Sequence, residues 1–175
     1  MTRHETRPDE NRTPGAPHGV DATLDDLAAA GSDLLLLDQQ LCFSLSAASR
    51  AFGSIYRTAL KDIGLTYPQY LVMLVLWEHD ELPVKRLGER LRLDSGTLSP
   101  LLKRLEATGL VVRERSPQDE RSVIVSLTPT GRDLREPARA VPRYIGAAAG
   151  LPLSDLRTLR ELLTRLTANL DAAGA

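Results

Sequence analysis

The chain has 175 residues, 42% of them apolar, which is enough to bury the core of one domain of ordinary size. It contains neither a run of ~18 apolar residues nor a basic-then-apolar leader, so we expect no membrane span and no export, and a cytoplasmic location by default. The net charge of −1 conceals an asymmetry, because residues 1–40 carry three basic and eight acidic side chains whereas residues 82–121 carry nine basic and six acidic ones.

Residues 1–33 are predicted to form a disordered acidic tail, because they are rich in Pro, Gly, Asp, Glu and Arg and show almost no periodicity. A short helix over Ala22–Ala30 is the one element that the segment could form. The folded domain is therefore expected over residues 34–175.

Hydrophobic periodicity begins at Asp38, a residue type that caps helices, and ends at Gly64. The apolar positions step by three and four residues, as on one face of a long helix: Leu41, Leu45, Ala48, Phe52, Ile55 and Ala59. The neighbouring stripe holds mostly small residues: Cys42, Ser46, Ser49, Gly53 and Tyr56. Small residues allow a close helix contact, either with a second chain or within the core of this one, and the pattern leaves both open.

Three shorter helices are predicted next. Thr66 caps the first, whose buried face is expected to carry Tyr70, Leu71, Leu74, Val75 and Trp77. The second is expected from Leu82 to Leu91. The third is expected to start at Thr97, which would place Pro100 in the first turn, and to end at Gly109 with an apolar stripe of Leu98, Leu101, Leu102 and Leu105. The last two helices form a helix-turn-helix candidate.

After Gly109 the period changes to two, which indicates strands. Segments 110–115 and 121–127 flank a turn sequence, Ser116 to Glu120, so a β-hairpin is predicted directly after the helix pair. The expected fold is mainly α with a small β-hairpin wing, a winged helix-turn-helix. A further helical region follows, and its last helix carries an apolar stripe that a symmetric dimer would cover: Leu156, Leu159, Leu163, Leu166 and Leu170.

Polar and basic residues gather on the predicted third helix and on the hairpin. The helix offers Ser95, Thr97, Ser99, Lys103 and Arg104, which suit base edges and phosphates. The hairpin offers Arg113, Arg115 and Arg121, with Asp119 near enough to orient Arg121. A projecting arginine suits a narrow minor groove, so double-stranded DNA is the favoured partner, although a solvated helix face would look similar.

Cys42 is the only cysteine, which excludes an intrachain disulfide and a cysteine metal cluster. The histidines are scattered as well, so we expect no metal site and no cofactor. The thiol is either a small buried apolar group or a reactive one. Tyr56 follows 14 residues later, which is ~21 Å along a continuous helix, so it cannot touch Cys42 of its own chain.

Three segments of the sequence resemble the MarR family of winged-helix regulators: residues 65–71, residues 93–106, and Asp119-Glu120-Arg121 ahead of Val123. Leu41-Cys42-Phe43 ahead of the tyrosines is similar to the organic hydroperoxide resistance regulators of that family, here of the one-cysteine type. The resemblance covers residues 34–135. Residues 66–130 are taken as the DNA-binding core, with dimerisation helices over 38–62 and 130–172.

This resemblance implies a homodimeric repressor that binds a pseudo-palindromic operator and releases it when organic hydroperoxides oxidise Cys42. It further implies that Tyr56 and Tyr67 of the partner subunit hydrogen-bond the thiol, and that a small cytosolic thiol completes the reaction. Two alternatives remain: a regulator that answers a small aromatic ligand and has a structural Cys42, and a thiol peroxidase. The sequence contains neither a Cys-x-x-Cys pair nor a Pro-x-x-x-Thr-x-x-Cys loop, so no catalytic residues and no enzyme are expected.

Overall fold

The structure, a computed structural model, describes residues 33, 35–117, 119 and 121–174. The predicted tail up to residue 32, with its helix over Ala22–Ala30, lies outside the described residues. The chain divides into two compact units, residues 1–47 and residues 48–175, and each is described by itself. The predicted domain boundary near residue 33 stays a prediction.

In the first unit, the 3₁₀ helix η1 (Leu37–Gln39) comes before the first residues of α2 (Leu41–Ala59). The prediction that the long helix begins at Asp38 is therefore wrong. Gln40 adopts an extended backbone, with φ −85° and ψ 107°, which separates the 3₁₀ turn from the α-helix. The side chains of Leu35, Leu36 and Leu37 are exposed.

In the second unit, η2 (Lys61–Ile63) follows α2 and ends at Gly64, whose φ of 66° is favourable only for glycine. The helix α3 (Tyr67–His79) then begins with the predicted Thr66 cap, and Gln69 completes a capping box. Its buried face differs from the predicted one. Tyr70 is buried as expected, but Val72, Met73 and Leu76 are the other buried apolar residues, whereas Leu74 is 40% exposed.

The short strand β1 (Glu81–Pro83) precedes α4 (Val84–Leu91), so the helix predicted from Leu82 begins two residues later. Sequence periodicity could not detect β1 because three residues are too few to show a period, and the strand exists through its pairing with a distant strand.

The helix α5 (Ser95–Ala107) also begins two residues away from the predicted start, and this time earlier. The Asp94 carboxylate accepts the Thr97 backbone N–H at 2.9 Å and thereby caps the helix. Pro100 consequently lies inside the helix, in its second turn, where it removes one backbone hydrogen bond.

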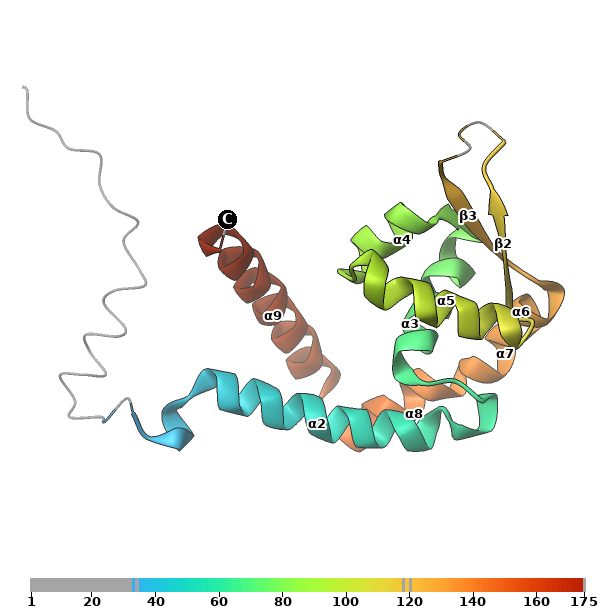
Figure 1. Cartoon of the computed structure of the whole chain (residues 1–175). Helices are drawn as coiled ribbons and strands as arrows, with labels where there is room; N and C mark the ends of the chain where they lie inside the picture. Colours follow the sequence, from blue (N-terminus) through green and yellow to red (C-terminus); the bar gives the residue numbers. More distant parts are fainter. Residues whose placement is uncertain (1–32, 34, 118, 120, 175) are drawn as a thin grey trace, which may run out of the picture. The chain divides into compact units, whose positions relative to one another are not determined.

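The predicted β-hairpin is confirmed as β2 (Val111–Arg115) and β3 (Val123–Leu127), and β1 adds a third antiparallel strand in the order β1-β3-β2. Figure 1 shows the hairpin extending beyond α4 and α5. The helix-turn-helix and the hairpin together form a winged helix, as the sequence predicts.

A single apolar core holds this winged-helix body together. Its fully buried large side chains come from α3, α4, α5 and the hairpin, and also from the residue after α2: Leu60, Val72, Met73, Leu76, Leu87, Leu98, Leu102, Leu105, Val111 and Val125. The core therefore fixes the orientation of α5 relative to the hairpin.

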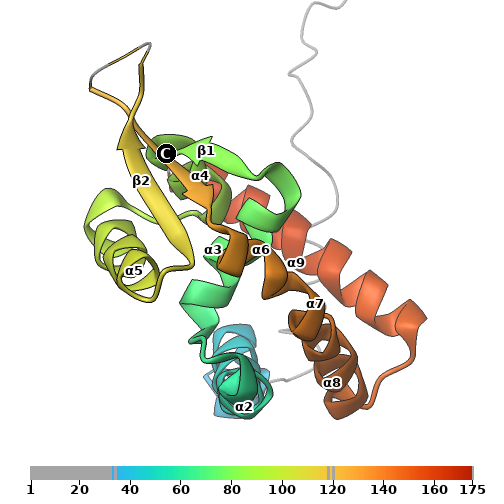
Figure 2. The same cartoon turned by 90° about the vertical axis from the view of Figure 1, so that its right-hand side faces the viewer.

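Four helices follow the hairpin: α6 (Pro129–Asp133), α7 (Arg135–Ala138), α8 (Ala140–Ala149) and α9 (Leu153–Ala173). Figure 2 shows α6, α7 and α8 leading away from the base of the sheet to the loop before α9. No residue of α9 is buried, although the predicted leucine stripe is present. The side chains of Leu159 and Leu170 are 42% and 62% exposed.

Candidate functional site

The exposed face of α5 carries most of the polar residues predicted for it. Ser95, Lys103 and Arg104 are exposed, and Ser99 is half-buried. Thr97 is also exposed, but its hydroxyl donates to the Asp94 carboxylate at 2.8 Å and belongs to the helix cap. These hydrogen bonds from Thr97 hold the pKa of Asp94 below its ordinary value, so the cap is a charged carboxylate near neutral pH.

The arginines of the hairpin fall into two groups. Arg115 and Arg121 are exposed, as predicted. Arg113 instead pairs with Glu106 of α5, its Nε lying 3.0 Å from a carboxylate oxygen and its side chain only 26% exposed. The prediction that Arg113 projects beyond the body is therefore wrong, because α5 supplies an acidic partner at the base of the hairpin. The hydrogen bond from Arg113 lowers the pKa of Glu106, so this pair is ionic at neutral pH.

Asp119 shapes the hairpin tip through the backbone. Its carboxylate accepts the backbone N–H of Arg121 at 3.0 Å, and its carbonyl accepts the N–H of Ser122 at 2.8 Å. The sequence predicts that Asp119 orients Arg121, and the described contact is with the backbone of Arg121. The Arg121 side chain itself stays exposed.

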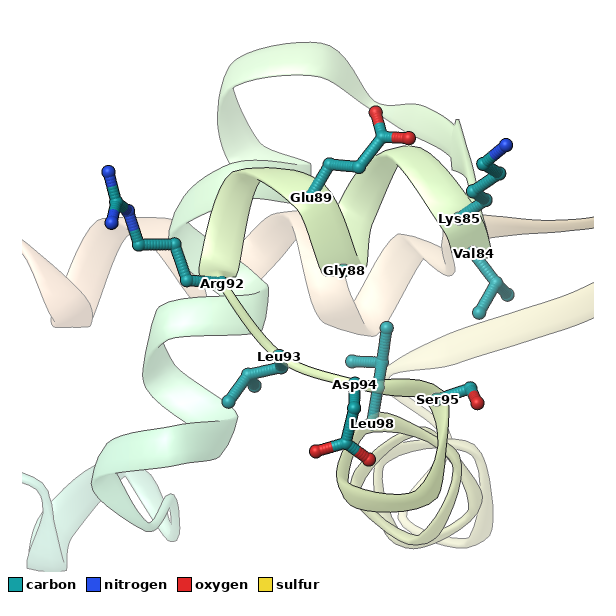
Figure 3. A pocket seen from close by; sticks show the side chains of 9 residues that line it. All are labelled: Val84, Lys85, Gly88, Glu89, Arg92, Leu93, Asp94, Ser95 and Leu98. Atoms are coloured by element: carbon teal, nitrogen blue, oxygen red, sulfur yellow. The ribbon is translucent and has the colours of Figure 1, made fainter. Parts of the chain in front are cut away.

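Lys85, in the first turn of α4, is a basic residue that the sequence analysis did not single out. It lines a hollow of about 370 Å³ between α4, α5 and the hairpin, together with Ser99, Arg113, Asp119 and Arg121. A second hollow, of about 540 Å³, lies between α4 and α5 and also includes Lys85 (Figure 3). The clue in the sequence was a Lys-Arg pair directly after Val84, at the start of a short helix.

Cys42 belongs to the first unit, where it is the second residue of α2 and is exposed. An exposed thiol at this position is accessible to solutes, so the alternative of a buried, inert Cys42 has no support within the chain.

The two predicted tyrosines belong to the second unit and lie against each other. The ring centroids of Tyr56 and Tyr67 are 4.3 Å apart, and Tyr70 lies 6.2 Å from Tyr56. Burial, with the neighbouring phenols Tyr67 and Tyr70, raises the pKa of Tyr56, so its hydroxyl stays protonated and able to donate a hydrogen bond. Tyr67 is 40% exposed at this aromatic cluster.

Among the described residues, no group of three or more His, Cys, Asp or Glu side chains could hold a metal ion. No helix in the same part of the chain is both long and apolar enough to cross a bilayer.

A helix-turn-helix followed by a basic hairpin is the architecture of winged-helix DNA-binding regulators. A profile of the SarA/Rot transcriptional regulators matches residues 54–136. The chain is also similar to the reduced form of the protein AbfR solved bound to DNA, with 37% identity, a TM-score of 0.65, and coverage of 85% of this chain and 98% of that one.

Two relatives extend the match beyond the winged helix. The organic hydroperoxide resistance transcriptional regulator of Bacillus subtilis is 47% identical over 138 residues, which cover 79% of this chain and 94% of that protein. The regulator TtmR of Methylorubrum extorquens is 51% identical over 136 residues, covering 78% of this chain and 70% of that protein. The chain belongs to the MarR family of winged-helix transcriptional regulators, in the group of organic hydroperoxide resistance regulators.

Proposed function

We propose that the protein is a homodimeric repressor in the cytoplasm that releases its operator when an organic hydroperoxide oxidises Cys42. The observation that carries this proposal is the exposed thiol in the first turn of α2, in a chain of this family.

The operator is contacted by α5 and the hairpin. The α5 residues Ser95, Thr97, Ser99, Lys103 and Arg104 lie in or beside the major groove, while Arg115 and Arg121 extend toward the minor groove. Arg113 and Asp119 act indirectly, because one fixes the base of the hairpin and the other its tip. Two copies require a pseudo-palindromic site with half-sites ~10 bp apart.

The uncovered stripe on α9 supports the dimer. An isolated helix with leucines exposed along one face is unfavourable in water, and a second copy offers an identical apolar face to bury it. A single subunit therefore leaves this apolar stripe exposed to water, and dimerisation would bury it.

The redox step is a nucleophilic substitution at oxygen. The Cys42 thiolate attacks one peroxide oxygen, forming an S–O bond as the O–O bond breaks, and the departing alkoxide takes a proton to become an alcohol. Cysteine is oxidised to sulfenic acid while the hydroperoxide is reduced. Since the chain contains no second cysteine, a small cytosolic thiol then forms a mixed disulfide with loss of water.

Tyr56 and Tyr67 of the partner subunit donate hydrogen bonds to the thiolate before it attacks. Their contact with each other places two phenols together, and the raised pKa of Tyr56 keeps that phenol a donor. Such donors would hold the sulfur in position and stabilise its charge.

The decisive experiment is a gel shift on the DNA beside the protein's own gene, with and without cumene hydroperoxide. Wild-type protein should release the DNA, and a reducing thiol should restore binding. Cys42→Ser should bind equally well and stay bound at the same dose, because a hydroxyl cannot form a sulfenic acid. Release of Cys42→Ser by the peroxide would exclude the redox mechanism, and release by a small aromatic compound alone would favour a ligand-responsive regulator.

Heterodimers test the proposed cross-subunit contact. One heterodimer pairs a Cys42→Ser chain with a Tyr56→Phe chain, so its only thiol faces an intact Tyr56 and should oxidise at close to the wild-type rate. The other pairs a chain carrying both changes with a wild-type chain, so its only thiol faces a phenyl ring and should oxidise slowly. Equal rates, or the opposite order, would contradict a contact in trans.

A further inference from the structure

The hollow between α4, α5 and the hairpin brings together two cations and a hydroxyl from segments that are distant in sequence. Lys85 comes from the first turn of α4, Ser99 from α5, and Arg121 from the hairpin. The hollow has a volume of about 370 Å³. It is lined by three basic residues and one acidic residue, so its charge favours an anion.

Two cations at or beside this hollow already have partners. Arg113 pairs with Glu106, and Arg86, the neighbour of Lys85, lies 2.9 Å from Glu89. In the described part of the chain, neither Lys85 nor the Arg121 guanidinium forms an ion pair, and both side chains are exposed. The single acidic residue of the hollow, Asp119, directs one carboxylate oxygen at the Arg121 backbone N–H.

Two acidic residues, Glu89 and Asp94, line the other hollow, and Glu89 is already paired with Arg86. Figure 3 shows Lys85 at one end of α4 and Arg92 at the other, while the Asp94 carboxylate points away from Lys85. That carboxylate is occupied by Thr97. The positive charge of Lys85 is therefore available to a ligand that enters from the side of the hairpin and α5.

We propose that Lys85, with the Ser99 hydroxyl, binds one backbone phosphate of the DNA in each half-site, beside the Arg121 side chain that extends toward the minor groove. The inference rests on the proposed function and adds a contact to it. A lysine ammonium is a compact charge that suits a single phosphate, and a serine hydroxyl can donate to a phosphate oxygen. Because α4, α5 and the hairpin converge here, a phosphate held between them would set the depth and angle at which α5 enters the groove.

The salt dependence of operator binding tests the contact. Lys85→Ala should reduce the slope of log K against log salt by ~0.9 per subunit, because one phosphate contact is lost in each half-site. Lys85→Arg should keep most of the slope. Lys61→Ala is the matched control, since it removes an exposed lysine from η2, outside the hollow, and should leave the slope unchanged.

Ethylation interference identifies the phosphate. Wild-type protein should show one sensitive phosphate per half-site that becomes insensitive in Lys85→Ala, while the preference among operator bases stays the same. An unchanged slope and footprint in Lys85→Ala would overturn the phosphate contact but leave the regulator intact. Failure of the wild-type protein to bind any operator would overturn the proposed function and the contact with it.

Discussion

The winged-helix body and α9 use similar leucine stripes with opposite results. In α5, Leu98, Leu102 and Leu105 are at most 1% exposed, because α3, α4 and the hairpin cover them. In α9, a comparable stripe has no buried residue. Periodicity thus predicts which side of a helix is apolar, but it does not predict whether that side is buried within the same chain or against another molecule.

Because of this difference, the stability of α9 should depend on dimerisation, whereas that of the winged-helix body should not. The body gains its stability from contacts within one chain, so its shape should not change with protein concentration. No described segment buries the apolar stripe of α9, so its burial by a second copy would link its stability to the concentration of subunits.

The largest effect is expected from a cavity in the body. Leu102→Ala removes a fully buried side chain and should lower the free energy of unfolding by ~2–5 kcal/mol, measured by urea denaturation at fixed protein concentration. Leu162→Ala, which truncates a leucine of α9 that is 51% exposed, is the control and should cost far less. Equal losses would show that α9 is as well packed as the body.

A charge on the α9 stripe should prevent dimerisation. Leu163→Asp would bury a carboxylate against an apolar face, weakening the dimer ~100-fold or more, as measured by analytical ultracentrifugation. Ala168→Asp introduces the same charge on the opposite, exposed face of the helix and should leave the dimer intact. If both variants remain dimeric, the stripe is not the subunit interface.

Two arginines of the wing are expected to have different roles, one in DNA binding and one in the stability of the hairpin. Arg121→Ala should weaken operator binding by ~1–3 kcal/mol and flatten its salt dependence, as measured by fluorescence anisotropy. Arg113→Ala removes an internal ion pair and should act mainly on the stability of the hairpin. A flatter salt dependence in Arg113→Ala than in Arg121→Ala would reverse the two assignments.

The smallest effect concerns acid stability. The pKa of Glu106 is lower in the folded protein than its ordinary value. The ionised carboxylate therefore stabilises the fold at any pH above the ordinary pKa, and this stabilisation is lost as the pH falls through the lowered pKa of the folded state. The wild-type protein should therefore have a higher free energy of unfolding than Glu106→Gln near neutral pH, and this difference should shrink below about pH 4.3, as measured by urea denaturation at several pH values. A constant difference at every pH would mean that the Arg113 contact does not depend on the carboxylate charge.

The sequence predicted those elements whose determinants are local. The Thr66 cap, the two strands of the hairpin and the α9 stripe all depend on patterns of residues close in sequence, and the structure contains each of them. The exposure of Cys42 did not follow from its sequence neighbours, because they allowed an internal contact as well as an open surface.

The predictions that failed depend on partners distant in sequence or on a choice between two nearby caps. The strand β1 exists because residues 81–83 pair with residues 124–126, which no local pattern indicates. Arg113 is not exposed as predicted, because it pairs with Glu106, which lies seven residues away in another element. The start of α5 was placed at Thr97 so that Pro100 would fall in the first turn, but the hydrogen bonds from Thr97 to Asp94 show that Asp94 is the cap and that the helix tolerates Pro100 in its second turn.

Trp77 gives the protein an intrinsic fluorescent probe. It is the only tryptophan in the chain, and its indole N–H donates to the Gly131 carbonyl at 2.8 Å, which ties α3 to α6. Its ring also lies 6.2 Å from that of Tyr70, which in turn lies 6.2 Å from Tyr56. Excitation energy passes efficiently from tyrosine to tryptophan over such distances. The fluorescence of Trp77 therefore reports on the arrangement of the phenols as well as on its own hydrogen bond to Gly131. Changes in the contact between α3 and α6, or in the aromatic cluster, can thus be followed in unlabelled protein, in real time.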